Sequence, residues 1–130
     1  MTVRNIYESK RGILCSGNKC VICGWSKKGN DGTPLVEGAH IKPYENDISA
    51  DVYRNIIALC PNHHTQFDRF AFYIDCETRK TVFLDESDED HSIDISDSIK
   101  HVDTRFLAYR QYLFNQKNGE RNEEDKEMGA

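Results

Sequence analysis

The order of apolar and polar positions along the chain predicts an α+β domain built from short elements. Apolar residues at helical spacing predict a first helix over residues 3–14 and a last helix over residues 102–116. In the last helix, the stripe predicted to face the core consists of Val102, Phe106, Tyr109 and Leu113. Short apolar runs bounded by turn residues predict strands at 35–41, 56–60, 72–75, 81–84 and 92–95.

A helix is also expected directly after the second strand. Residues 61–70 begin with Pro61, which suits the first position of a helix, and the spacing of their polar and apolar residues is helical. Residues 35–70 therefore predict strand, loop, strand and helix in succession, preceded by the Cys-x-x-Cys segment "CVIC" at residues 20–23.

Composition and charge change this picture little. The 130 residues suit one domain, which we expect over residues 1–116, and the formal net charge is -5. Residues 81–130 hold 6 Lys+Arg and 13 Asp+Glu, whereas residues 1–80 hold 11 and 9, so the acidity is C-terminal. We expect the acidic run 85–90 to be a solvated turn and residues 117–130 to be a disordered tail. Without an apolar run of membrane length or a cleavable leader, a cytoplasmic location without membrane contact is expected.

The cysteines carry the first candidate chemistry. Five cysteines are an odd number, which argues against a framework made only of disulfides. Cys20 and Cys23 are three residues apart, and Cys60 and His63 repeat that spacing. Two such pairs can complete a tetrahedral Zn²⁺ site, so we predict that these four residues form a structural zinc site. A redox pair or two core cysteines is the alternative, but no βαβ context for a thioredoxin-like motif is apparent.

His64 cannot share the ion of His63 if both lie on one helix, because neighbouring residues point roughly 100° apart around the axis. Asp68 is one turn further along the same face, and His64 and Asp68 could hold one divalent ion with open positions. His40, at the end of the first strand, could remove a proton from water near such an ion. Asn55 could hold His40 in position through hydrogen bonds to the facing backbone. An exposed helix histidine, a structural strand histidine and an ordinary loop asparagine are the plain alternatives.

Together the segments "CVICG", "LVEGAHIKPY" and "RNIIALCPNHHTQFDRF" resemble the HNH nucleases of the ββα-metal superfamily. The order His40, Asn55, His64 carries the resemblance, which covers roughly residues 10–75 and is closest to the bacterial restriction and defence branch. It implies a ββα-metal core with a zinc knuckle, a metal-dependent endonuclease activity on DNA, and a C-terminal closing helix.

The resemblance also implies roles for residues. His40 would be the general base, Asn55 would orient its loop, and His64 would bind the catalytic ion, Mg²⁺ or another divalent ion, together with Asp68. Many relatives carry a further ligand directly before the base, where this chain has Ala39. That departure puts the ligand set in question, and Glu37 is a weaker candidate for the missing ligand.

Partners follow from the same reading. Candidate contacts to the nucleic-acid backbone are Lys27, Lys28, Lys42, Arg54 and Arg69. One ion per domain predicts one cut strand, so cleavage of both strands would need a homodimer or two sequential nicks. Specificity could come from a fused or separate domain, in restriction or phage defence. Two rivals stay open, namely a zinc-stapled nucleic-acid-binding module without catalysis and an RNA-directed toxin nuclease.

Overall fold

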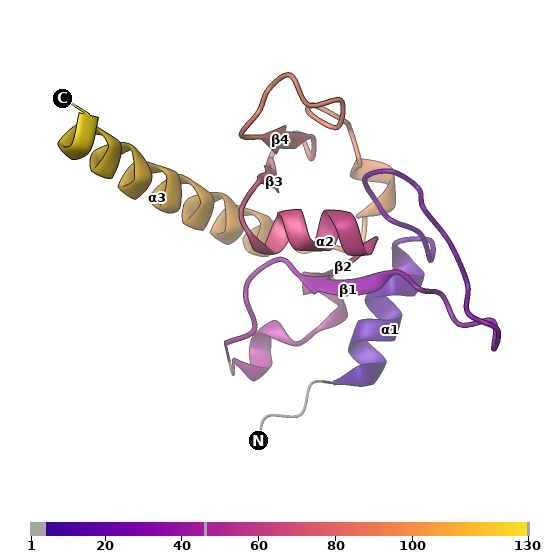
Figure 1. Cartoon of the computed structure of the whole chain (residues 1–130). Helices are drawn as coiled ribbons and strands as arrows, with labels where there is room; N and C mark the ends of the chain where they lie inside the picture. The colour runs from indigo at the N-terminus through magenta and orange to yellow at the C-terminus, as the bar shows by residue number, and fades with distance from the viewer. Residues whose placement is uncertain (1–4, 46, 130) are drawn as a thin grey trace.

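The computed structural model describes residues 5–45 and 47–129, with side chains through residue 119. It has an α+β architecture around two small antiparallel sheets (Figure 1). The helices and strands, in chain order, are α1 (Ile6–Cys15), β1 (Glu37–His40), β2 (Ile56–Leu59), α2 (Pro61–Asp68), β3 (Phe72–Ile74), β4 (Thr81–Phe83) and α3 (Thr104–Gly129). No helix in these residues is long and apolar enough to span a membrane.

The first sheet positions the residues singled out above. β1 pairs with β2 so that His40 lies opposite Ile56 and Glu37 opposite Leu59. β2 is buried along its whole length, and both α1 and α2 pack against it (Figure 1). The approach of α1 is close, because a Cβ atom added at Gly12 would lie 2.6 Å from the Ile56 side chain. The expected succession of strand, loop, strand and helix is therefore confirmed.

The second sheet extends the core toward α3. The rings of Phe72 on β3 and Phe83 on β4 stack with centroids 4.6 Å apart, and Phe67 of α2 packs against Phe72. The strand predicted over residues 92–95 is wrong, because this segment forms only an isolated bridge between Lys80 and Asp94. Ser92 has a φ of 65°, in the left-handed region, which an extended strand does not accommodate.

The C-terminal helix departs from the predicted pattern in two ways. Its buried positions are Leu107, Arg110 and Phe114, whereas Tyr109 is exposed, so the predicted stripe is displaced by one residue. The apolar pattern did not identify the inward face, because the charged residue Arg110 lies on it. The helix also continues to Gly129 and so includes residues 117–129, where disorder was predicted. The Glu, Lys and Arg residues of this segment are good helix formers. The domain boundary at residue 116 stays a prediction.

Candidate functional site

The four residues predicted to bind zinc converge in the structure. One ligand atom from each of Cys20, Cys23, Cys60 and His63 lies within 4.8 Å of the others. The Nδ1 atom of His63 is 3.6 Å from the Cys20 sulfur and 3.2 Å from the Cys60 sulfur. Cys60 is the N-cap of α2, and its sulfur accepts a hydrogen bond from the His63 N–H at 3.4 Å. The start of α2 therefore holds the second ligand pair against the knuckle that carries the first.

The chemistry of this cluster fits a structural metal ion. Cys20, Cys60 and His63 are buried, and three thiols with one imidazole are a typical closed zinc set. Burial raises the pKa of Cys20, but hydrogen bonds from His63 and from backbone N–H groups outweigh it and lower that pKa to about 6. Burial and the neighbouring thiols raise the pKa of Cys23 to about 11. Without an ion, the His63 imidazole is the positive partner of the Cys20 thiolate, because their hydrogen bond raises the pKa of His63 to about 10. A bound divalent cation would take over that role and stabilise the deprotonated form of all three thiols.

A carboxylate supports the histidine of this cluster from behind. The Nε2 atom of His63 lies 2.9 Å from Oδ2 of Asp90, so the imidazole is held between the thiols and an acid. The hydroxyl of Thr81 in turn donates to the backbone carbonyl of Asp90 at 2.5 Å. A carboxylate in this place fixes the ring orientation of a metal-binding histidine. Asp90 belongs to the acidic run that was expected to be a solvated turn, and nothing in its sequence context marked it out.

The neighbouring histidine faces an open pocket. A cavity of about 440 Å³ is lined by Gly38, His40, Pro43, Tyr44, Glu45, His64, Asp68, Phe70 and Arg110. The Nε2 atom of His64 lies 3.4 Å from Oδ2 of Asp68, one turn further along α2. Its Nδ1 atom lies 2.8 Å from Oε1 of Glu37 on β1. The two carboxylates thus approach different nitrogens of one ring, and only Asp68 lines the pocket together with His40.

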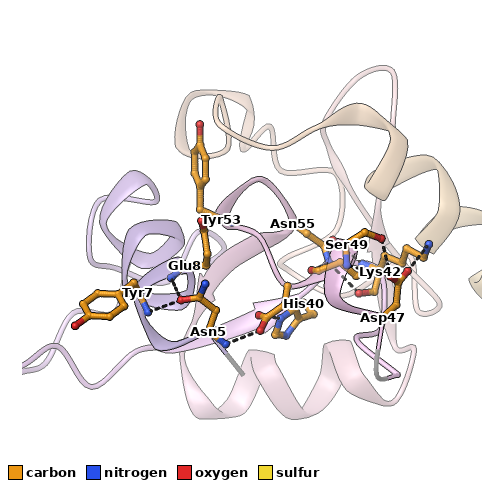
Figure 2. A network of polar contacts seen from close by, with 11 residues as sticks. Asn5, Tyr7, Glu8, His40, Lys42, Asp47, Ser49, Tyr53 and Asn55 are labelled. Carbon is orange, nitrogen blue, oxygen red and sulfur yellow. Dashed lines mark hydrogen bonds and ion pairs between the residues drawn. The ribbon is translucent and has the colours of Figure 1, made fainter. Parts of the chain in front are cut away.

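His40 and Asn55 belong to one polar network (Figure 2). The Nε2 atom of His40 lies 3.0 Å from Oδ1 of Asp51, a buried residue that the sequence analysis did not single out. Asn55 is fully buried and accepts a hydrogen bond from the Lys42 N–H at 2.8 Å. Its side-chain amide donates to the carbonyl oxygens of Lys42 at 3.0 Å and Ala50 at 2.7 Å. Asn55 therefore ties together both ends of the loop that follows His40.

Arg110 of α3 is a further pocket residue that the motif did not include. Its guanidinium donates to the carbonyl oxygens of Phe67 and Ile41, which directly precede Asp68 and follow His40. The group also lies over the rings of Phe67 and Phe70, at 4.1 and 3.9 Å from their centroids. Burial lowers the pKa of Arg110 to about 10, and attraction to Asp68 opposes that shift. Its place next to both catalytic candidates was hidden by its distance along the chain.

Ala39, where many relatives carry a ligand, is fully buried in the core. Among the basic candidates, Lys42 is half-buried, and the others are exposed. Lys42 pairs with Asp47 at 3.4 Å, and its ammonium group lies 4.9 Å from the Tyr109 ring centroid. Arg54 donates to the His101 carbonyl at 3.4 Å, and Arg69 is the exposed C-cap residue of α2. Lys28 forms an isolated bridge with Pro34, in the long segment before β1.

Comparisons with known proteins agree with this geometry. Residues 20–75 match a family model described as HNH endonuclease. A solved structure titled "Modification dependent TagI restriction endonuclease" is similar, with 30% sequence identity and a TM-score of 0.57. The match covers 77% of this chain but only 38% of that protein. The comparison with curated proteins gave no match. The matched residues include all four zinc candidates, His40, Asn55, His64 and Asp68.

Proposed function

We propose that this protein, whose residues 20–75 belong to the HNH endonuclease family, is a metal-dependent nuclease that hydrolyses phosphodiester bonds of DNA. The observation that carries the proposal is the open pocket shared by His40, His64 and Asp68. This pocket of about 440 Å³ brings a candidate base together with a candidate ion-binding pair. The closed Cys/His cluster offers no open space for a substrate. The endonuclease title of the similar structure supports the same reaction class.

The division of work in this pocket follows from its contacts. His64 and Asp68 would hold one divalent ion, for which we propose Mg²⁺. The bound ion would supply Lewis-acid stabilisation of negative charge on the phosphate and on the leaving oxygen. His40 would remove a proton from the attacking water as general base. Asn55 would keep His40 and its loop in place through its hydrogen bonds to Lys42 and Ala50.

The Cys/His cluster would act on the fold and not on the phosphate. Zn²⁺ held by Cys20, Cys23, Cys60 and His63 would fasten the knuckle to the N-terminus of α2. All four ligand positions are supplied by the protein, so substrate has no position to occupy. This staple would fix the orientation of α2, the helix that also carries His64 and Asp68.

The substrate side of the proposal is DNA, with a cytoplasmic role in restriction or phage defence. Lys42, Arg54 and Arg69 would contact the backbone. Because the chain spans 38% of the similar restriction endonuclease, we propose that a fused or separate domain selects the cleavage site. One ion-binding pocket per domain would cut one strand, so a homodimer or two successive nicks would cut both.

The test is a plasmid-nicking assay of wild type and His40→Ala with added Mg²⁺. A missing general base should lower the nicking rate about 10²- to 10⁴-fold, with the circular dichroism spectrum and zinc content unchanged. His91→Ala is the matched control, because His91 lies outside the pocket and binds the Phe83 N–H. A folded His40→Ala protein that nicks at the wild-type rate would remove His40 from the mechanism.

The same assay separates the rivals. Duplex DNA, single-stranded DNA and RNA are tested in parallel. Cleavage of RNA alone would show that RNA, and not DNA, is the substrate. Wild-type protein that retains DNA in a mobility-shift assay but cleaves none of the three substrates at any Mg²⁺ concentration would be a binding module.

A further inference from the structure

We propose that Asp51 is the positioning residue for His40, and that the two form an aspartate–histidine dyad in the pocket. The inference deepens the proposed function and rests on it for its kinetic meaning, whereas the dyad itself rests on geometry. The Nε2 atom of His40 and Oδ1 of Asp51 are 3.0 Å apart. Their side chains are 9% and 5% exposed, so water competes little for this contact.

The contact selects one nitrogen of His40 for proton transfer. A neutral imidazole carries its hydrogen on one nitrogen, and a neighbouring carboxylate accepts only from an N–H group. Asp51 therefore holds the hydrogen on Nε2, which leaves Nδ1 with its lone pair free to accept a proton. Without Asp51 the hydrogen could occupy either nitrogen, and a fraction of molecules would present an N–H group where a base is needed.

Asp51 is itself fixed from two directions. Its Oδ2 atom accepts a hydrogen bond from the Asn5 N–H, at the N-cap of α1, at 2.5 Å. The residue before it, Ala50, has its carbonyl held by the Asn55 amide. In this view Asn55 acts on His40 partly through Asp51, because it fixes the segment from which the carboxylate projects. A carboxylate held in this way does not need to reorganise when the reaction begins.

The charge of Asp51 is directed at His40. Among the described residues, Asp51 forms no ion pair with a lysine or arginine, whereas nearby Asp47 pairs with Lys42. A buried carboxylate needs hydrogen-bond donors or a positive partner, and here the partners of Asp51 are the Asn5 N–H and the His40 ring. When Nδ1 accepts the proton of the attacking water, the His40 ring gains a positive charge, and Asp51 stabilises it. The proton stays on His40 and the Nε2 hydrogen stays on Nε2, as in other dyads of this type.

The first test is nuclear magnetic resonance, which does not depend on activity. Long-range ¹⁵N–¹H spectra distinguish the two neutral forms of each histidine, and His40→Ala identifies the His40 signal among the five histidines. Zinc-loaded wild type at a pH where the ring is neutral should show hydrogen on Nε2 alone. Asp51→Asn should give a mixture, and Asp47→Asn should match wild type. Hydrogen on Nδ1 in wild type would overturn the dyad, even if Asp51→Asn fails to fold.

The second test is kinetic. With zinc-loaded enzyme and plasmid DNA, Asp51→Asn should lower kcat by up to about 10⁴-fold, the loss that the same Asp→Asn change causes in a Ser-His-Asp triad. KM for DNA and the Mg²⁺ concentration for half-maximal activity should stay at wild-type values, because Asp51 is proposed to contact neither the DNA nor the ion. A folded Asp51→Asn enzyme with unchanged kcat would overturn the inference while the proposed nuclease stands. A wild-type protein that cleaves no substrate would contradict the proposed function. The nuclear magnetic resonance spectra alone would then test whether Asp51 and His40 form a dyad.

Discussion

Two sites on one short helix differ in a way that adjacency in sequence conceals. His63 and His64 are neighbours on α2, but the side chain of His63 is 8% exposed and that of His64 is 25% exposed. The first enters a cluster whose four candidate metal ligands all come from the protein. The second faces an open pocket, with Asp68 near its Nε2 atom and Glu37 near its Nδ1 atom. The closed site suits a metal that stabilises the fold, and the open site suits a metal that leaves room for substrate.

The two histidines also share a feature that helps to interpret the open site. His63 presents Nδ1 to the thiols and Nε2 to Asp90, so one nitrogen faces ligands and the other a supporting acid. His64 presents Nε2 to Asp68 and Nδ1 to Glu37. By the same division, Asp68, which lines the pocket, would be the co-ligand of the ion, and Glu37 would be the supporting acid. Glu37 would then not supply the ligand that Ala39 lacks.

The largest difference between the two sites is expected when each histidine is removed in turn. His63→Ala should lose zinc and unfold, because structural zinc contributes roughly 10–16 kcal/mol of folding free energy in small domains. His64→Ala, the matched control one residue away, should keep zinc and the fold and lose nicking. Elemental analysis, thermal denaturation and the nicking assay measure these three properties on both proteins.

The opposite pattern is equally informative. A folded His63→Ala protein with one zinc ion per chain would show that the Cys/His cluster is not the staple. Loss of zinc from the His64→Ala protein would show that His63 and His64 belong to one metal site.

A smaller effect is expected from the carboxylates of the open site. Asp68→Asn should raise the Mg²⁺ concentration needed for half-maximal nicking by about tenfold or more, since a carboxylate is a far better Mg²⁺ ligand than an amide. Glu37→Gln should raise it less, because Glu37 would only orient the His64 ring. Titration of activity with Mg²⁺ measures both variants on one scale. A larger effect from Glu37→Gln would exchange the two roles.

The sequence predicted which residues meet in the Cys/His cluster better than it predicted the side chains that support either site. Cys20, Cys23, Cys60 and His63 were predictable because thiol and imidazole pairs at fixed spacing on turns constrain where the ion can lie. Asp51 and Asp90 were not, because their roles arise from loops that fold back over β1 and α2. An aspartate in a loop looks the same in sequence whether it faces water or a buried imidazole.

Arg110 shows a second limit, which concerns the apolar pattern within α3. Helical spacing of the apolar residues placed Tyr109 inward, but the structure buries Arg110 instead. Two backbone carbonyls and two aromatic rings make that burial possible, and no pattern within the helix indicates them. The fold class and the order of elements were predictable from local periodicity, whereas the inward face of α3 depended on these partners from other segments.

The smallest expected effect on nicking comes from Asp90, which lies behind the Cys/His cluster. Asp90→Asn should weaken zinc binding about 10- to 100-fold, because the carboxylate that orients and polarises the His63 ring becomes neutral. Competition with a chelator of known affinity measures the change, and Glu89→Gln, an exposed neighbour, is the control. At saturating zinc, the nicking rate should equal that of wild type, since Asp90 contacts His63 and not the pocket. Unchanged zinc affinity would show that Asp90 does not support His63. Loss of nicking at full zinc occupancy would show that the two sites of α2 are not independent.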